Sequence, residues 1–288
     1  MIKIGCHVSI AEGIEKAPRR AHDIGCECFQ FFSRSPYGGS ATGITQDNAS
    51  KFISSAEKYG FTPWRDYVIH APYFVNLASK DSRIYYGSIN ALRKELETAL
   101  LVKALYVIIH IGSSKDMEEP DIQKQINEKV LKALRKIHDG YEGKAMLLLE
   151  ITAGSGNIIG DTFEEIGYFI KKMKEEDIKI GFCLDTCHGF AAGYDFSDPQ
   201  KVRKIFTEID KEIGLDNLKC VHFNDSQAEF DSHVDRHEHI GKGKIGINGL
   251  EETIRLVKNY DINLIIETGH DKIREDLAIT GKMRALAN

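Results

Sequence analysis

The sequence lacks any apolar run close to the roughly 20 residues that a membrane-spanning helix needs, which argues against a membrane protein. Proline is scarce, with six in 288 residues, and no Pro-rich or low-complexity tract marks a linker between domains. The first residues read as a strand and lack the charged-then-apolar layout of a signal peptide. We therefore expect a single domain over residues 1–288, in a cytoplasmic protein.

Cysteine is also limited, and its placement predicts the same compartment. Most of the six Cys lie in or beside apolar runs, as Cys28, Cys183 and Cys220 do, which is typical of reduced, buried thiols. The spacings Cys26-x-Cys28 and Cys183-x3-Cys187 match neither the usual zinc fingers nor the usual redox motifs.

Positive charge is in short supply, with 43 acidic and 38 basic residues and a net charge of −5. Charge alone therefore argues against a nucleic-acid-binding protein. The argument fails if the chain binds metal ions. Three divalent cations would bring the net charge to about +1 and concentrate positive charge at their site.

Short apolar runs, by contrast, are numerous, and each has about the length of a buried parallel strand. Helical periodicity fills most of the intervals, for example over 89–102, 122–138, 163–174, 199–213 and 250–258. Strands alternating with helices predict one (β/α)8 TIM barrel, with an open doubly wound sheet as the alternative. The predicted strands cover residues 2–7, 28–32, 67–70, 106–111, 145–150, 180–185, 218–222 and 264–267.

Six of these strands carry a candidate metal ligand at the last residue or, for the strand 106–111, one residue before it. A barrel gathers all the strand ends on one face, where its active sites occur, whereas an open sheet would spread them along a line. A carboxylate that closes a buried strand is costly unless it is paired or metal-bound. The six residues are His70, His110, Glu150, Asp185, His222 and Glu267.

Two further motifs add to this set. Asp185-Thr186-Cys187-His188 puts a carboxylate and an imidazole three residues apart, and Asp235 and His237 point the same way if their segment is extended. Alone, each histidine would suit a capping or core position, and Asp235 would suit a solvated loop. Together the nine residues predict a centre for more than one divalent metal ion. His7, His233 and His239 receive no role.

At these motifs the chain resembles the endonuclease IV family of apurinic/apyrimidinic endonucleases. The resemblance covers residues 5–267. The stretches 181–188 and 234–241 are highly specific in combination. The matching stretches are 70–78, 147–154, 181–188, 222–226 and 234–241. The resemblance implies a TIM barrel with three zinc ions that cleaves double-stranded DNA on the 5′ side of abasic sites.

The resemblance also implies the ligand sets. His70, His110 and Glu150 would bind one zinc ion, and Glu150 would bridge to a second ion. The second ion would be completed by Asp185, His222 and Glu267, and the third would be bound by His188, Asp235 and His237. No Cys ligand is required, so Mn or Fe could replace one zinc ion.

For recognition of the lesion, the resemblance implies that Tyr73 and Phe74 intrude into the DNA. The loop over 33–40 departs from the family, because Tyr37 stands where an Arg is common. Arg34 and Tyr37 are the candidates to fill that gap or to contact phosphate.

The expected chemistry is hydrolysis of a phosphodiester by metal-bound hydroxide, which leaves a 3′-hydroxyl. Metal-bound water can have a pKa of about 7, and ions about 4 Å apart can stabilise the attacking and leaving oxygens. We expect a monomer. A sugar isomerase or epimerase with one metal ion at Glu150, Asp185, His222 and Glu267 is the alternative enzyme, and a DNA-damage binding module without catalysis is the alternative outside enzymes.

Overall fold

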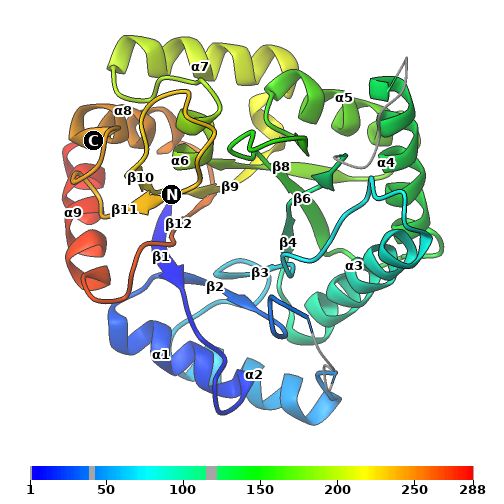
Figure 1. Cartoon of the computed structure of the whole chain (residues 1–288). Helices are drawn as coiled ribbons and strands as arrows, with labels where there is room; N and C mark the ends of the chain where they lie inside the picture. Colours follow the sequence, from blue (N-terminus) through cyan, green and yellow to red (C-terminus); the bar gives the residue numbers. More distant parts are fainter. Residues whose placement is uncertain (1, 39–42, 115–121, 288) are drawn as a thin grey trace.

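A closed barrel of eight parallel strands forms the centre of the molecule (Figure 1). This computed structural model describes residues 2–38, 43–114 and 122–287. Around the barrel the strands follow the order β1-β12-β9-β8-β6-β4-β3-β2, and β1 pairs with β2 to close it. The strands are β1 (Lys3–His7), β2 (Cys28–Phe32), β3 (Tyr67–His70), β4 (Tyr106–Ile109), β6 (Met146–Glu150), β8 (Ile180–Asp185), β9 (Leu218–His222) and β12 (Asn263–Ile266). The barrel prediction is confirmed, and the open sheet is wrong.

The strands are apolar on both faces because both faces are covered. One set of buried side chains packs inside the barrel, and a larger set packs between the strands and the helices. The interior set is Cys28, Val68, Ile108, Leu148, Cys183, Cys220 and Ile265. At Gly5 on β1 any Cβ would overlap the carbonyl oxygen of Cys28, so only glycine fits beside β2 there.

Helices form the outer ring of the barrel (Figure 1). They are α1 (Ala17–Ile24), α2 (Gln46–Lys58), α3 (Ser82–Val102), α4 (Ile122–His138), α5 (Phe163–Lys174), α7 (Pro199–Glu212), α8 (Gly246–Val257) and α9 (Ile273–Leu286). The short helix α6 (Thr186–Ala191) directly follows β8 and lies inside this ring. Helices α4 and α5 have the predicted bounds, and α3 begins seven residues before the predicted start at residue 89. Helix α6 is not predictable from the sequence pattern, because its six residues are too few for a period of 3.6 to stand out.

Short strands stiffen the loops that follow the barrel strands. Strand β10 (Asp225–Ser226) pairs with β11 (His237–Glu238), and β5 (Gly112–Ser113) pairs with β7 (Ile158–Ile159), both antiparallel. Two turns of 3-10 helix, η1 (Ile14–Lys16) and η2 (Leu215–Asn217), complete the described elements. The segment 33–38 is a loop, as predicted, while residues 39 and 40 lie outside the described residues.

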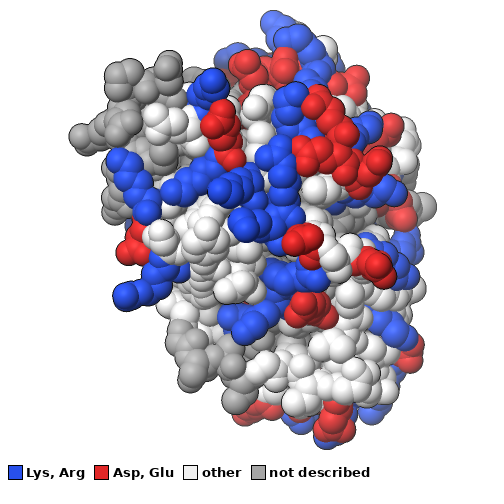
Figure 2. Space-filling view, turned by 90° about the vertical axis from the view of Figure 1, so that its right-hand side faces the viewer, with Lys and Arg blue, Asp and Glu red and all other residues white. Residues whose placement is uncertain are grey.

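The flank of the barrel that α3 and α4 cover is rich in Lys and Arg, with Asp and Glu interspersed (Figure 2). On α4 the exposed side chains include Lys124, Lys132, Arg135 and Lys136. Charges of both signs on an amphipathic helix are typical of a solvated face. Within the described ranges, every helix is too short or too polar to cross a bilayer.

Candidate active site

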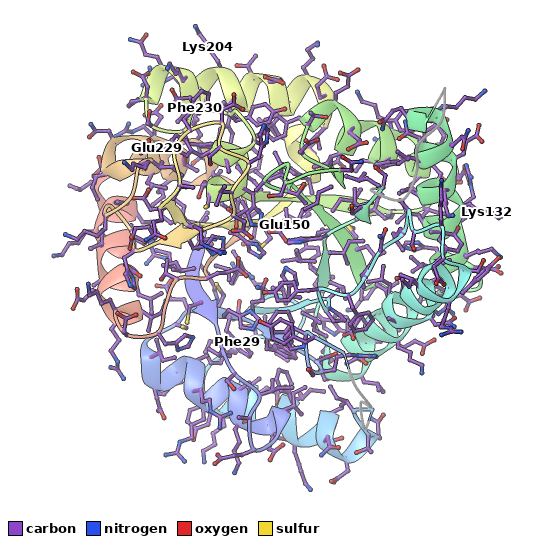
Figure 3. The ribbon with its side chains drawn as sticks, viewed as in Figure 1. Phe29, Lys132, Glu150, Lys204, Glu229 and Phe230 are labelled. Atoms are coloured by element: carbon purple, nitrogen blue, oxygen red, sulfur yellow. The ribbon has the colours of Figure 1, made fainter. Side chains whose placement is uncertain are left out.

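The metal-binding side chains predicted from the sequence lie together at the carboxyl ends of the barrel strands. His70, Glu150, Asp185 and His222 are the last residues of β3, β6, β8 and β9. His110 and Glu267 come one residue after β4 and β12. Glu150 lies near the centre of the ring of strands (Figure 3).

Each oxygen of the Glu150 carboxylate faces two imidazole nitrogens. Oε2 lies 3.1 Å from His70 Nε2 and 3.0 Å from His110 Nε2. Oε1 lies 2.8 Å from His222 Nδ1 and 3.3 Å from His188 Nδ1. A carboxylate whose two oxygens serve different groups of ligands has the geometry needed to bridge two cations.

The protonation of the cluster follows from its charges. Burial alone would raise the pKa of Glu150, but His222 and His110 hold that pKa well below its usual range. Burial would raise the pKa of Glu267, but His222, with His237 and His70, lowers that pKa to about 2. Conversely, burial would lower the pKa values of His188 and His222, yet the neighbouring carboxylates raise both well above the usual range. The carboxylates therefore require positive charge beside them, supplied by protons or by metal ions.

Two of the histidines are oriented by backbone carbonyl groups. His70 Nδ1 donates to Ala71 O at 2.7 Å, which leaves Nε2 facing Glu150. His188 Nδ1 donates to Ile151 O at 3.0 Å, which leaves Nε2 at 3.2 Å from Asp235 Oδ2. Such hydrogen bonds fix the tautomer of metal-binding histidines.

Helix α6 explains the spacing of Asp185 and His188. Asp185 is the N-cap, and its Oδ1 accepts from His188 N at 2.9 Å. Oδ2 lies 3.7 Å from His237 Nε2 and 3.8 Å from His222 Nδ1. Asp185 therefore contributes one oxygen to the helix and one to the site.

The pairing of β10 with β11 brings Asp235 and His237 to the cluster. Asp235 Oδ1 lies 3.4 Å from His237 Nε2. Burial would raise the pKa of Asp235, but the neighbouring His188 lowers it below its usual range. Next to them the buried Asp225 accepts hydrogen bonds at 3.0 Å from the backbone N–H groups of Gly241, Gly243 and Ile245. The glycine-rich loop 241–246 thus encloses a protein carboxylate instead of a phosphate.

Asn224 lies in the motif 222–226, which by itself predicts no role for it. Its Nδ2 donates to Asp185 Oδ2 at 2.9 Å, and its Oδ1 accepts from Glu267 N at 2.8 Å. Its position two residues after the end of β9 was the available signal, because polar side chains at strand ends line the active sites of barrels.

Several groups of side chains have the spacing of a metal site. Ligand atoms lie within 4.8 Å of one another in the set His70, His110 and Glu150, in the set Asp185, His188 and His237, and in the set His70, His222 and Glu267. In the described part of the chain, His110 Nε2 and His237 Nε2 are shielded from solvent and make no well-aligned hydrogen bond, although Glu150 Oε2 and Asp235 Oδ1 lie 3.0 and 3.4 Å away. Nitrogen and oxygen donors of this kind suit zinc, manganese or iron, so the residues present fit a metal centre.

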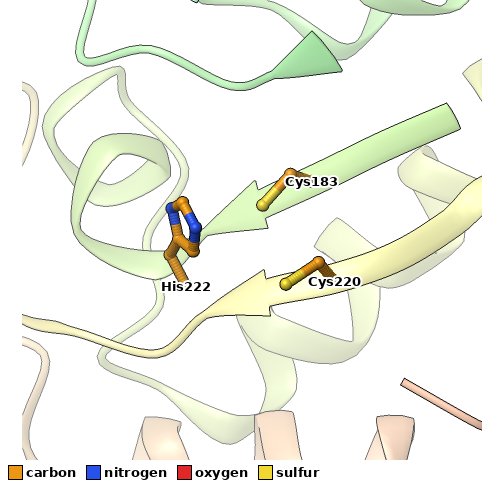
Figure 4. Close-up of side chains that lie close together, drawn as sticks. All are labelled: Cys183, Cys220 and His222. Carbon is orange, nitrogen blue, oxygen red and sulfur yellow. The ribbon is translucent and has the colours of Figure 1, made fainter. Parts of the chain in front are cut away.

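Two thiols lie close to this centre. Cys183 and Cys220 have sulfur atoms within 4.8 Å of each other and of a ring nitrogen of His222, and the three side chains converge in Figure 4. Both sulfurs belong to the packed interior of the barrel. Burial raises the pKa of the Cys183 thiol, so this thiol is neutral and packs as a small apolar group.

The aromatic residues proposed to contact DNA lie at the rim of the cluster. Tyr73 and Phe74 are 52% and 39% exposed, and the Tyr73 ring lies 5.8 Å from the His70 ring. Tyr37 is 86% exposed and lies 6.0 Å from the Tyr73 ring. These three rings are therefore available to a ligand beside the cluster.

Arg34 is engaged by a buried carboxylate on α3. Its Nε lies 2.9 Å from Oε1 of Glu95, a fully buried carboxylate on α3, and Ser33 Oγ donates to Glu95 Oε2 at 2.5 Å. Burial raises the pKa of Glu95, while Ser33 and Arg34 act against that rise. The ion pair anchors the loop that carries Tyr37 to α3.

The fold and the site together define a xylose isomerase-like TIM barrel, and a family model of that description matches residues 18–286. A solved D-tagatose 3-epimerase-like protein aligns with a TM-score of 0.73 at 19% identity, covering 100% of this chain and 98% of its own. At that identity the likeness shows the fold alone.

Other relatives are more similar. A probable endonuclease 4 of Cenarchaeum symbiosum is 37% identical, covering 99% of this chain and 100% of the relative. The crystal structure of endonuclease IV from Thermus thermophilus aligns with a TM-score of 0.84 at 32% identity, covering 99% of both chains. The chain belongs to the endonuclease IV family, and the resemblance stated from its motifs is confirmed.

Proposed function

We propose that the protein is a metal-dependent phosphodiesterase that cleaves double-stranded DNA on the 5′ side of abasic sites and leaves a 3′-hydroxyl. The observation that carries the proposal is the gathering of nine side chains with oxygen or nitrogen donors, Glu150 at their centre, on one face of the barrel. The relatives named endonuclease 4 and endonuclease IV support cleavage of a nucleic acid.

The proposal assigns three zinc ions to these side chains, with manganese or iron possible at one position. His70, His110 and Glu150 would hold the first ion, and Glu150, Asp185, His222 and Glu267 the second. His188, Asp235 and His237 would hold the third. When bound, the ions would supply an activated water molecule and neutralise charge on the phosphate.

Residues of the chain would set the spacing of the metal ligands and hold their rings in orientation. Glu150 faces His70 and His110 with one oxygen and His222 with the other, so it fixes the spacing between the first two ligand sets. The backbone carbonyls of Ala71 and Ile151 hold the His70 and His188 rings with one nitrogen directed at the site. No side-chain nucleophile is required, and burial raises the pKa of the Cys187 thiol to about 12, as for a neutral, packed thiol.

Recognition of the damaged strand is assigned to the rim. Tyr73 and Phe74 would stack against the bases beside the lesion, and a missing base makes extrusion of the nucleotide less costly. Tyr37, next to Tyr73, would extend the aromatic surface.

The protein would act as a monomer in the cytoplasm. Its six cysteines are all free and buried, as in proteins that stay reduced. Three bound divalent ions would also offset the net charge of −5 that otherwise disfavours DNA.

Metal counting tests the proposal against a single-metal isomerase. That enzyme would use Glu150, Asp185, His222 and Glu267, and leave the other five ligands without a role. Elemental analysis of zinc-loaded, desalted protein should find about three ions per chain. A count of about one would contradict the three-ion centre and favour the isomerase.

A further inference from the structure

Gln30 is a fully buried amide on β2 that contacts three side chains of the site face. They come from three other strand ends: His7 on β1, His222 on β9 and Glu267 after β12. The sequence predicts no role for Gln30, because nothing within the apolar run 28–32 reveals which side chains lie opposite it.

The partners of Gln30 fix the orientation of its amide. The atom 2.6 Å from Glu267 Oε1 must be the nitrogen, because an ionised carboxylate only accepts hydrogen bonds. The amide oxygen is then the atom 2.8 Å from His222 Nε2. The second amide hydrogen points to His7 Nδ1 at 3.1 Å. Three of the four hydrogen-bonding positions of this amide are therefore used.

This orientation determines the hydrogen positions of His222. Since an amide oxygen only accepts, His222 Nε2 must carry a hydrogen, and the neutral ring then has its lone pair on Nδ1. Nδ1 faces the site, 2.8 Å from Glu150 Oε1 and 3.2 Å from Glu267 Oε2. At the same time Gln30 occupies Oε1 of Glu267 and leaves Oε2 directed at the same place.

We propose that Gln30 is the positioning residue for one cation of the centre: it selects the Nδ1-ligand tautomer of His222 and aims His222 and Glu267 at the same ion. This inference rests on the metal ligands of the proposed function. It goes beyond them by assigning the ligand atoms Nδ1 of His222 and Oε2 of Glu267 to a single controlling side chain.

The other oriented histidines provide an internal contrast. His70 and His188 are held by the backbone carbonyls of Ala71 and Ile151, which no substitution of Gln30 removes. A change at Gln30 should therefore weaken one ion and leave the ions bound through His70 and His188 in place.

Gln30→Met tests this directly, because methionine has a similar length and no hydrogen-bonding groups. Zinc binding is measured by competition with a chromophoric chelator. One of the bound ions should bind about 10–100-fold more weakly, the usual effect of losing an outer-shell partner of a ligand. Proton–nitrogen NMR of the zinc-loaded protein should detect hydrogen on Nε2 of His222 in the original chain and a loss of that single tautomer in the variant.

Gln30→Glu separates the two contacts and has nearly the same shape. A glutamate still accepts from His222 Nε2, so the tautomer should persist. Its other oxygen would repel Glu267 Oε1, so zinc should still bind more weakly. The matched control is Asn263→Leu, which removes a buried amide that donates to Arg65 O at 2.7 Å, among residues outside the ligand sets. The control should lower stability and leave zinc affinity unchanged.

The outcomes distinguish this inference from the function it rests on. If the unsubstituted protein binds no zinc, the proposed function fails. If it binds zinc and both Gln30 variants keep its affinity and the Nε2–H tautomer, the role of Gln30 is refuted while the metal centre stands.

Discussion

The proposed ligand sets depend most on Glu150, since its two carboxylate oxygens face histidines of different sets. In Glu150→Gln one oxygen becomes an NH2 group, which cannot bind a cation. We predict that incision in single-turnover assays falls by several orders of magnitude, with at least one ion lost. Glu128→Gln, at an exposed position on α4, is the control and should keep full activity. Incision by Glu150→Gln near the rate of the original protein would refute the bridging assignment.

The exposed aromatics at the rim give a second prediction. Stacking is worth about 1–3 kcal/mol per base, so Tyr73→Ala combined with Phe74→Ala should abolish the preference for abasic over intact duplex. Bound metal should be unchanged. Equilibrium binding to the two duplexes provides the measurement, and Tyr86→Ala, a half-exposed tyrosine on the α3 flank, is the control. If the double variant keeps its selectivity, recognition lies in the Tyr37 loop or in the deformability of the DNA.

At the scale of single residues, the sequence identifies the proposed metal ligands better than the residues that hold those ligands in position. His70, Asp185 and His222 could be located because each closes a short apolar run, and a barrel brings such ends together. Gln30 and Asp225 could not, because their partners lie in segments distant along the chain, and only the folded barrel brings the groups into contact.

Among the elements, the loop that follows β10 is organised around a buried carboxylate. Asp225→Asn puts an NH2 donor in place of either Oδ2, which accepts from Gly241 N and Gly243 N, or Oδ1, which accepts from Ile245 N. We predict a loss of about 1.5–3 kcal/mol in the free energy of unfolding, measured by urea denaturation. The ion held by Asp235 and His237 should also bind more weakly, because β11 lies on this loop. Unchanged stability and zinc affinity would contradict this account of the loop.

Prediction of the elements was limited by length. Helices α4 and α5 span several turns with a regular apolar stripe, so their bounds could be read from the period of 3.6 residues. Helix α6 has only six residues, directly after Asp185, so it gives no period. Its sequence signal is the N-cap Asp185, which was interpreted only as a ligand although it also caps the helix.

For the whole molecule, the charges of the centre make stability depend on pH and metal together. His188 and His222 have folded-state pKa values above the ordinary 6.5. Their contribution is therefore complete below about pH 6.5 and is lost as the pH rises through the folded value. Glu150 and Glu267 have lowered pKa values, so their contribution is present above the ordinary 4.5 and is lost as the pH falls. This cluster should stabilise the metal-free protein most between about pH 4.5 and 6.5.

We therefore predict that the Tm of metal-free protein falls between about pH 6 and pH 8. The increase in Tm on adding zinc should grow over the same range, because zinc displaces protons from its ligands. Differential scanning calorimetry with and without zinc makes the comparison, and His222→Gln should flatten the metal-free slope. If the Tm of the metal-free protein rises with pH over this range, other titratable groups dominate the pH dependence of its stability.

Cleavage of a duplex that contains one abasic site tests the central claim most directly. Zinc-loaded protein is incubated with the duplex, with and without a chelator, and the ends of the products are mapped. The account predicts one cut, on the 5′ side of the abasic site, with a 3′-hydroxyl that a polymerase extends. Chelation should abolish the cut, zinc should restore it, and intact duplex should remain uncut. Binding without cleavage, a cut on the 3′ side, or cleavage that survives full removal of metal would contradict the account.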